Sequence, residues 1–225
     1  MSRWLVLLVA SYLLGAIPFS WAVVRVATGL DVRRVGSGNV GATNAMRAAG
    51  KKIGVAALLL DVLKGIVPVV AARALGAPAV VVSCAAALAV LGHMYSPFLR
   101  MRGGKGVATA AGALGAGAPL AAALSVVVFV ATVWWKRYVS LGSIAAVSTF
   151  PLFVLMLIAW RDGLQRAELP YIASSALVPA LIVWKHRDNI ARLRAGTEPR
   201  LGEGRRRGGN GDDGEAAVAA TRGER

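Results

Sequence analysis

Apolar residues fall in long, nearly uninterrupted runs along this chain, separated by short stretches rich in glycine and basic residues. The runs lack both the alternation of a half-buried strand and the 3.6-residue stripe of a surface helix, which indicates helices surrounded by apolar material. Seven runs stand out, at about 4–24, 53–75, 78–98, 107–118, 119–135, 139–160 and 169–184. This pattern predicts an all-α fold, a polytopic membrane helix bundle of about seven membrane segments.

The first run carries no charge from Trp4 to Val24, and about 20 such residues are enough to cross a bilayer. A cleavable signal peptide is the alternative for this run. No convincing small-residue cleavage site precedes Pro18 and Phe19, and further apolar runs follow. We therefore expect a helix that is retained in the mature protein.

Residues 107–118 form the shortest run and decide the topology. At about 1.5 Å per residue this run reaches only roughly 18 Å, which indicates a short or re-entrant helix covered by protein at its ends. Gly117 and Pro119 mark a turn into the next segment.

With that turn, most basic residues between the runs fall on one side of the membrane, which the positive-inside rule makes cytoplasmic. They are Arg25, Arg33, Arg34, Arg47, Lys51, Lys52, Arg100, Arg102, Lys105, Lys136, Arg137 and the tail from Lys185. The other face keeps Arg3, Arg73, Arg161 and Arg166. We therefore expect the N-terminus outside and the C-terminus in the cytoplasm.

Composition agrees with a membrane protein and narrows the ligand class. Of the 225 residues 56% are hydrophobic, and the net charge is +15. In a soluble domain this charge would favour nucleic acid, but basic residues between apolar runs are better explained by topology and small anionic ligands, so we expect no nucleic acid partner. The single cysteine, Cys84, excludes a disulfide or a Cys-x-x-Cys metal site within the chain, and the two histidines have no obvious partner set for a metal.

The end of the chain differs from the rest. After about residue 202 it is rich in glycine and charge and has no aromatic residue. We expect a membrane domain over 1–202 and a disordered charged tail over 203–225.

The first polar motif is GSGNVGATNAMR, residues 36–47. It contains Gly-x-Gly-x-x-Gly, and Asp61 follows about twenty residues on, as in a dinucleotide-binding fingerprint. That fingerprint needs a soluble strand-helix-strand unit, whereas this motif follows an apolar run and Asp61 lies inside another. The glycines still allow backbone N–H groups to converge on an anion, and the neighbouring side chains add hydrogen-bonding groups and one fixed charge. The predicted phosphate-binding loop comprises Gly36, Ser37, Gly38, Asn39, Gly41, Thr43, Asn44 and Arg47. A hydrophilic turn between helices is the alternative.

The second motif places a lysine among glycines directly before an apolar run. Gly103, Gly104 and Gly106 surround Lys105, so the ammonium and the free N–H groups of a helix start are positioned to meet one anion. The order of residues differs from a Walker A loop. A positive-inside anchor is the alternative for Lys105, and it is the preferred interpretation for Arg100 and Arg102.

Three further groups complete the candidate chemistry. Asp61 and Lys64 share one helix face inside an apolar run, so either they pair with each other or Lys64 reaches a substrate phosphate. Ser143 begins an apolar run, where helix capping and ligand contact are both open. His186 and Asn189 lie three residues apart on one face at the membrane boundary, whereas His93 is interpreted as a satisfied interfacial histidine and Arg192 as part of a solvated basic surface.

In this order, GSGNVGATNAMR, DVLKGIVP, GHMYSPFLRMRGGKGVATAAG and HRDNIARLRAGTE closely resemble the bacterial acyl-phosphate:glycerol-3-phosphate acyltransferase family over about residues 4–202. The resemblance implies a multi-pass enzyme of the bacterial inner membrane with its active site on the cytoplasmic side. Such an enzyme transfers an acyl group from acyl phosphate to the 1-hydroxyl of sn-glycerol 3-phosphate, giving lysophosphatidic acid and phosphate in the first step of phospholipid synthesis.

The resemblance also assigns roles to residues. It implies Ser37, Arg47, Lys105, His186 and Asn189 as the catalytic set, and it gives Glu198 a structural role. It implies no cofactor, membrane lipid as the surroundings, and the enzyme that makes the acyl phosphate as a partner.

The residue chemistry agrees with an activated donor. Neither histidine fits the His-x-x-x-x-Asp pattern of many acyl-CoA-dependent enzymes, because Phe98 and Ala191 stand at the fifth position after them. Since phosphate is already a good leaving group, positioning and charge stabilisation suffice, and a substrate phosphate oxygen is the hypothesised base. A phosphate-ester transporter is the main alternative, but the chain shows no internal repeat and its motifs lie on one side. A scaffold that binds anionic lipid would leave the neutral Ser37, Asn39 and Asn189 unexplained.

Overall fold

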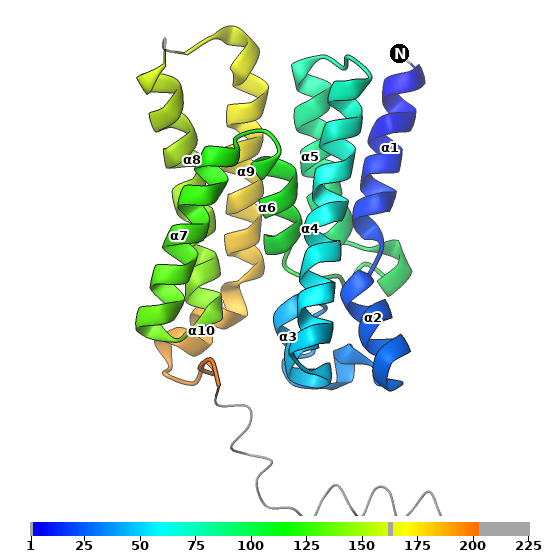
Figure 1. The fold of residues 1–225 in the computed structure, drawn as a ribbon, viewed down its shortest axis with the longest axis vertical. Helices are drawn as coiled ribbons and strands as arrows, with labels where there is room; N and C mark the ends of the chain where they lie inside the picture. Colours follow the sequence, from blue (N-terminus) through cyan, green and yellow to red (C-terminus); the bar gives the residue numbers. More distant parts are fainter. Residues whose placement is uncertain (1, 162–163, 203–225) are drawn as a thin grey trace, which may run out of the picture.

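The computed structural model describes residues 2–161 and 164–202, and within these residues all regular structure is helical (Figure 1). The predicted tail, 203–225, lies outside the described residues. The α-helices are α1 Ser2–Ala16, α2 Phe19–Thr28, α3 Ala42–Ala49, α4 Lys51–Ala74, α5 Ala79–Met94, α6 Val107–Gly115, α7 Pro119–Lys136, α8 Val139–Trp160, α9 Leu169–Lys185 and α10 Arg187–Arg194. Three short 3-10 helices are η1 Val32–Arg34, η2 Pro97–Leu99 and η3 Arg166–Glu168.

Several helices are long and apolar enough to span a membrane. In the described part of the chain there are five such candidates, Arg3–Thr28, Lys51–Ala74, Ala79–Leu99, Pro119–Lys136 and Val139–Trp160, and α9 is a shorter apolar helix. Their outward side chains are apolar, as lipid requires: Leu59 is 62% exposed, Val127 64% and Leu177 65%. The all-α membrane bundle is confirmed, whereas the count of seven segments and the orientation stay predictions.

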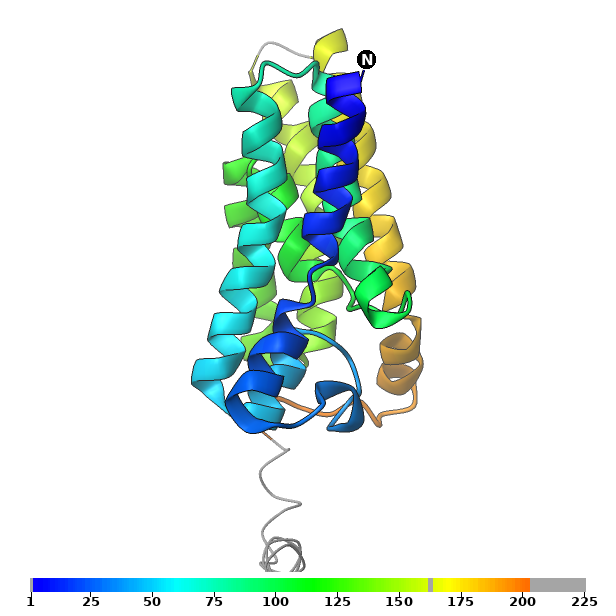
Figure 2. The same ribbon diagram turned by 90° about the vertical axis from the view of Figure 1, so that its right-hand side faces the viewer.

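The long helices run side by side, and α1 begins at the opposite end of the bundle from α10 (Figure 1). Figure 2 shows α2, α3 and α10 gathered at the lower end, where the last described residues also lie. The short helix α6 packs against α4, α5, α7 and α9. Buried apolar side chains of α5, α6, α8 and α9 form the larger core, and a smaller core joins α2, α3 and α4 at the lower end.

The first apolar run is two helices instead of the single helix expected over 4–24. It breaks at Ile17 and Pro18, because proline has no N–H to donate and its ring disfavours a continuing helix. The carbonyls near the break find other donors: Ser96 Oγ donates to the Ala16 oxygen at 2.6 Å, and Lys64 Nζ donates to the Ile17 oxygen at 2.8 Å. The break is therefore satisfied from within the protein.

Helix α6 is the predicted short segment, nine residues long, and the chain turns as expected before α7 begins at Pro119. Its last carbonyls are also satisfied. Tyr171 Oη donates to the Leu114 oxygen at 2.6 Å, and Arg73 Nη1 donates to the Ala116 oxygen at 2.7 Å. These bonds explain how so short a helix ends within the bundle.

Two glycines bring α4 and α6 into backbone contact. A Cβ atom at Gly65 would lie 2.1 Å from the Thr109 oxygen, and one at Gly112 would lie 2.1 Å from the Val62 oxygen. Small residues at such a crossing allow the close approach that stabilises helix pairs in lipid. The crossing fixes α6, whose first residue, Val107, follows two residues after Lys105.

Candidate active site

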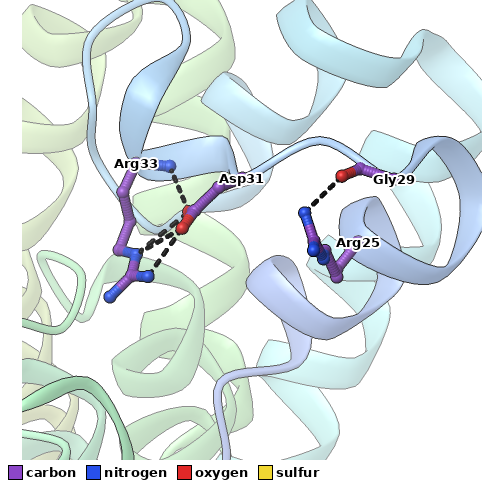
Figure 3. A network of polar contacts seen from close by, with 4 residues as sticks. All are labelled: Arg25, Gly29, Asp31 and Arg33. Carbon is purple, nitrogen blue, oxygen red and sulfur yellow. Dashed lines mark hydrogen bonds and ion pairs between the residues drawn. The ribbon is translucent and has the colours of Figure 1, made fainter.

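The first polar loop, between α2 and α3, is held at its start by two arginines (Figure 3). Arg33 donates from its side chain to the Asp31 carboxylate, with Nη2 2.6 Å from Oδ2, and its backbone N–H adds a further bond at 3.0 Å. These bonds hold the pKa of Asp31 well below its ordinary value. The Arg25 guanidinium donates to the Gly29 oxygen and fixes the end of α2.

Asn44, a predicted phosphate ligand, shapes this loop. Its buried amide donates to the Val32 and Val35 oxygens, both at 2.9 Å, and its Oδ1 accepts the Ser37 N–H at 3.1 Å. Any phosphate contact would have to replace one of these bonds. Asn44 thus holds Ser37 at the surface of the loop.

The loop glycines do not share one backbone role. Gly36 and Gly38 are left-handed, with φ of 59° and 67°, as the sequence led us to expect. Gly41 is extended, with φ of −159°, a conformation open to any residue, so the expectation of a special backbone conformation was wrong there.

The second loop carries Lys105 and is pressed against the end of α5. The Gly103 and Gly104 N–H groups donate to the Met94 and His93 oxygens at 3.2 and 3.1 Å, so these two amides bind helix α5. A Cβ at Gly104 would lie 2.3 Å from the Val40 oxygen, which shows that the two loops touch. Gly106, with φ of 85°, begins α6.

Lys105 meets helix α10 at the lower end of the bundle. Its Nζ donates to Asn189 Oδ1, and Asn189 Nδ2 donates in turn to Glu198 Oε1 at 2.6 Å. Arg192 Nε donates to the other carboxylate oxygen of Glu198 at 2.8 Å. The sequence did not predict this place for Arg192. Helix α10 and the segment after it thus hold one amide with its oxygen facing the lysine.

Burial and neighbouring charges set the ionisation of this cluster. Burial lowers the pKa of Lys105 from 10.5 to about 8, an effect that the negative Glu198 partly offsets. Arg47 of α3 also lowers this pKa, so its charge acts at the same place. Burial alone would raise the pKa of Glu198, but its hydrogen bonds, including those from Asn189 and Arg192, outweigh burial and hold the pKa below its ordinary value.

His186 lies beside this cluster and is neutral at pH 7. Burial lowers its pKa to about 4, although the hydrogen bond to the Ile182 oxygen, 2.7 Å from Nδ1, works in the other direction. Because a carbonyl only accepts, Nδ1 carries the proton and Nε2 is left as an acceptor. His186 is therefore suited to accept a hydrogen bond from a hydroxyl.

The structure brings Lys105, His186 and Asn189 together, with Arg47 close enough to influence the lysine. Ser37 is exposed on the first loop, whereas Asn39 and Thr43 are partly buried. Two other candidates are engaged within the protein. Lys64 pairs with Asp61 at 2.9 Å, and Ser143 donates to the Val139 oxygen of its own helix at 2.9 Å.

An apolar groove of about 390 Å³ runs along α4, α6 and the start of α7. Its lining residues are Val62, Ile66, Val70, Ala111, Gly112, Gly115, Ala116, Pro119 and Ala122. Most of these side chains are small or branched and none is polar, so the groove suits a hydrocarbon chain.

Comparison with known proteins gives one consistent result. The family model for glycerol-3-phosphate acyltransferase matches residues 5–196. The glycerol-3-phosphate acyltransferase of Geotalea daltonii is 43% identical, over 88% of this chain and 97% of its own length. That of Solidesulfovibrio magneticus is 47% identical, over 85% and 92%.

Solved structures agree with these relatives. The crystal structure of PlsY (YgiH), an integral membrane glycerol 3-phosphate acyltransferase, in its glycerol 3-phosphate form matches with a TM-score of 0.80 at 42% identity. The match covers 89% of this chain and 96% of that one. The lysophosphatidic acid form gives a TM-score of 0.77 at 41% identity.

Proposed function

Because the chain belongs to the glycerol-3-phosphate acyltransferase family, a family of membrane enzymes that acylate glycerol 3-phosphate to lysophosphatidic acid, we propose that its acyl donor is an acyl phosphate. The observation that supports this donor is the protonation state and hydrogen bonding of His186. His186 is neutral with a pKa of about 4, and its Nδ1 is bound to a backbone carbonyl instead of a carboxylate. Such an imidazole is a poor general base, which suits a donor whose leaving group is already activated.

In the proposed reaction the 1-hydroxyl oxygen of glycerol 3-phosphate attacks the acyl carbon, and the bond from that carbon to the phosphate oxygen breaks. The hydroxyl proton passes to a phosphate oxygen of the substrates, so the products are lysophosphatidic acid and inorganic phosphate. Nε2 of His186 accepts the hydroxyl hydrogen bond and orients the nucleophile. This substrate-assisted route requires no protein base stronger than the imidazole present.

The cations of the site hold the phosphates in this proposal. Lys105 keeps its bond to Asn189 and donates a second N–H to a phosphate oxygen, and Arg47 offers a planar fork from α3. The first loop contributes further hydrogen bonds to the phosphates, from Gly36, Ser37, Gly38, Asn39 and Thr43. Asn189, fixed by Glu198, orients the lysine.

The apolar groove along α4, α6 and α7 is proposed to take the acyl chain. Its lining on α6 begins at Ala111, six residues after Lys105, and continues to the start of α7. The groove measures about 390 Å³ and its lining is entirely apolar, which suits a fatty acyl chain. The lower end of the bundle, which carries the basic loops, is proposed to face the cytoplasm of a bacterial inner membrane. The enzyme that makes the acyl phosphate then serves as a partner in supply.

The test is release of inorganic phosphate by the purified protein in a lipidic mesophase supplied with palmitoyl phosphate and glycerol 3-phosphate. We expect release that depends on glycerol 3-phosphate, is absent when palmitoyl-CoA is the donor, and is lost in Lys105→Ala. Lys51→Ala is the matched control, because Lys51 is an exposed lysine at the lower end of α4. Equal transfer from palmitoyl-CoA would overturn the proposed donor, and full activity in Lys105→Ala would overturn the proposed role of the lysine.

A further inference from the structure

A cluster of buried polar groups lies between the break in the first span and the Lys105 loop. Asp61 and Lys64 of α4 and His93 of α5 are 1%, 2% and 7% exposed. Asp61 accepts from Ser20 Oγ at 2.8 Å and pairs with Lys64 at 2.9 Å, and its Oδ1 lies 3.7 Å from His93 Nδ1. Burying ionisable groups inside a membrane bundle is energetically costly, so their presence indicates a function.

The cluster is too tightly packed to bind a substrate. The cavity beside it measures about 10 Å³, which is the space of about one water molecule. Its lining includes Ser20, Ser96 and Gly104, so it lies against the second loop. The cluster therefore acts through the residues that it holds in place.

His93 supports Gly104 in two ways. Its backbone oxygen accepts the Gly104 N–H at 3.1 Å, and its ring lies so close that a Cβ on Gly104 would be 2.2 Å from Nε2. The Nδ1 side of the same ring faces Asp61, which Lys64 and Ser20 hold in place. The ring thus fills the space between a fixed carboxylate and the residue that precedes Lys105.

We propose that His93, backed by Asp61, is a positioning residue that sets where the Lys105 ammonium meets the substrate phosphate. The ring acts as a spacer: Asp61 faces its Nδ1 side at 3.7 Å, and Gly104 rests on its Nε2 side. The role rests on the proposed function of Lys105. Misplacing a reacting group by about 1 Å is enough to lower a rate on the order of 100-fold.

Three substitutions separate the spacer from a simple contribution to folding. Asn reaches the place of Nδ1 but leaves the space under Gly104 empty, whereas Gln reaches the place of Nε2. We expect His93→Ala and His93→Asn to lose about 100-fold in kcat/KM for glycerol 3-phosphate, and His93→Gln to recover most of it. A His93→Gln enzyme as impaired as His93→Ala would overturn the spacer role.

The pH profile gives a second readout that folding stability alone would not change. If the loop moves, Lys105 becomes more exposed and its pKa rises from about 8 towards 10.5, so the basic limb of activity moves to higher pH in His93→Ala and stays in place in His93→Gln. The charged and titratable groups that face this lysine are Arg47 of α3, His186, Asp188 and Arg192 at α10, and Glu198 beyond it. None of them is changed by the substitution.

The matched control is Ser83→Ala, which removes a buried hydroxyl from α5 away from the loop. It is expected to leave the basic limb unchanged even if it lowers the melting temperature. A His93→Ala enzyme that melts earlier but keeps the wild-type pH limb and kcat/KM would overturn the proposal. Lys105→Ala belongs in the same series: its full activity would remove the assignment of the lysine and the positioning role together, whereas an inactive Lys105→Ala beside an unaffected His93→Ala would remove only the latter.

Discussion

The crossing of α4 and α6 predicts a large effect from one added methyl group, in Gly112→Ala. The new Cβ would lie 2.1 Å from the Val62 oxygen, whereas an ordinary contact between carbon and oxygen is about 3.3 Å. The oxygen belongs to the backbone of α4 and the Cβ is bonded directly to the backbone of α6, so neither yields without moving its helix. The two helices must separate by roughly 1.2 Å at this point.

That separation has two consequences. Overpacking of this kind destabilises by about 1–3 kcal/mol, so the melting temperature should fall. Helix α6 also carries the Lys105 loop at its start, and a shift of about 1 Å there is expected to reduce kcat on the order of 100-fold.

The measurements are phosphate release from palmitoyl phosphate and thermal unfolding followed by tryptophan fluorescence. Gly115→Ala is the matched control, because it adds a methyl group to the same helix and the same groove lining as Gly112→Ala. Its Cβ would meet the Ala122 Cβ at 3.1 Å, which needs a shift of only a few tenths of an ångström, so the two variants differ in the helix crossing. Wild-type turnover and melting in Gly112→Ala would refute both the close crossing and its link to the lysine.

Three further predictions concern the loops and the buried pair. The kcat/KM for glycerol 3-phosphate should fall as pH rises through about 8, where Lys105 loses its proton. Any activity left in Lys105→Arg should not show this fall, because arginine stays charged. If the fall near pH 8 persists in Lys105→Arg, it belongs to another group. Asn44→Ala should cost about 1–3 kcal/mol and raise KM, and Asn44→Asp should be no better because it cannot donate to Val32 and Val35; wild-type melting and KM in both would contradict this role for the amide. Asp61→Asn should destabilise by about 3–5 kcal/mol because it strands the Lys64 charge, and adding Lys64→Met should restore much of the melting temperature; a double variant as unstable as the single one would count against the pair as the cause.

Much of the fold follows from apolar runs and turn residues. The short segment and the turn before Pro119 were predictable because length and charge bias both required them. The break at Pro18 was not, because both halves of the run are equally apolar and the carbonyls are satisfied by Lys64 and Ser96, which are distant in sequence. Hydrophobicity indicates which residues are removed from water, but not which polar side chains then satisfy the backbone carbonyls in place of water.

The site shows the same limit. The sequence predicted Lys105 and Asn189 as site residues, and the structure joins the two side chains. The sequence alone does not distinguish a glycine whose N–H is free to bind an anion from a glycine that lets two backbones approach closely. Gly103 and Gly104 are of the second kind. Arg192 was interpreted as solvated surface, because nothing in a spacing of six residues reveals that it holds Glu198.

The shortness of α6 bears on the routes by which substrates enter and products leave. At nine residues, or about 13 Å, the helix starts among its neighbours instead of at the end of the bundle. In the proposed arrangement, glycerol 3-phosphate and inorganic phosphate exchange with water through the lower end, whereas the acylated product leaves sideways along the groove. New lipid then enters a single leaflet, and populating the other leaflet requires a separate flipping step.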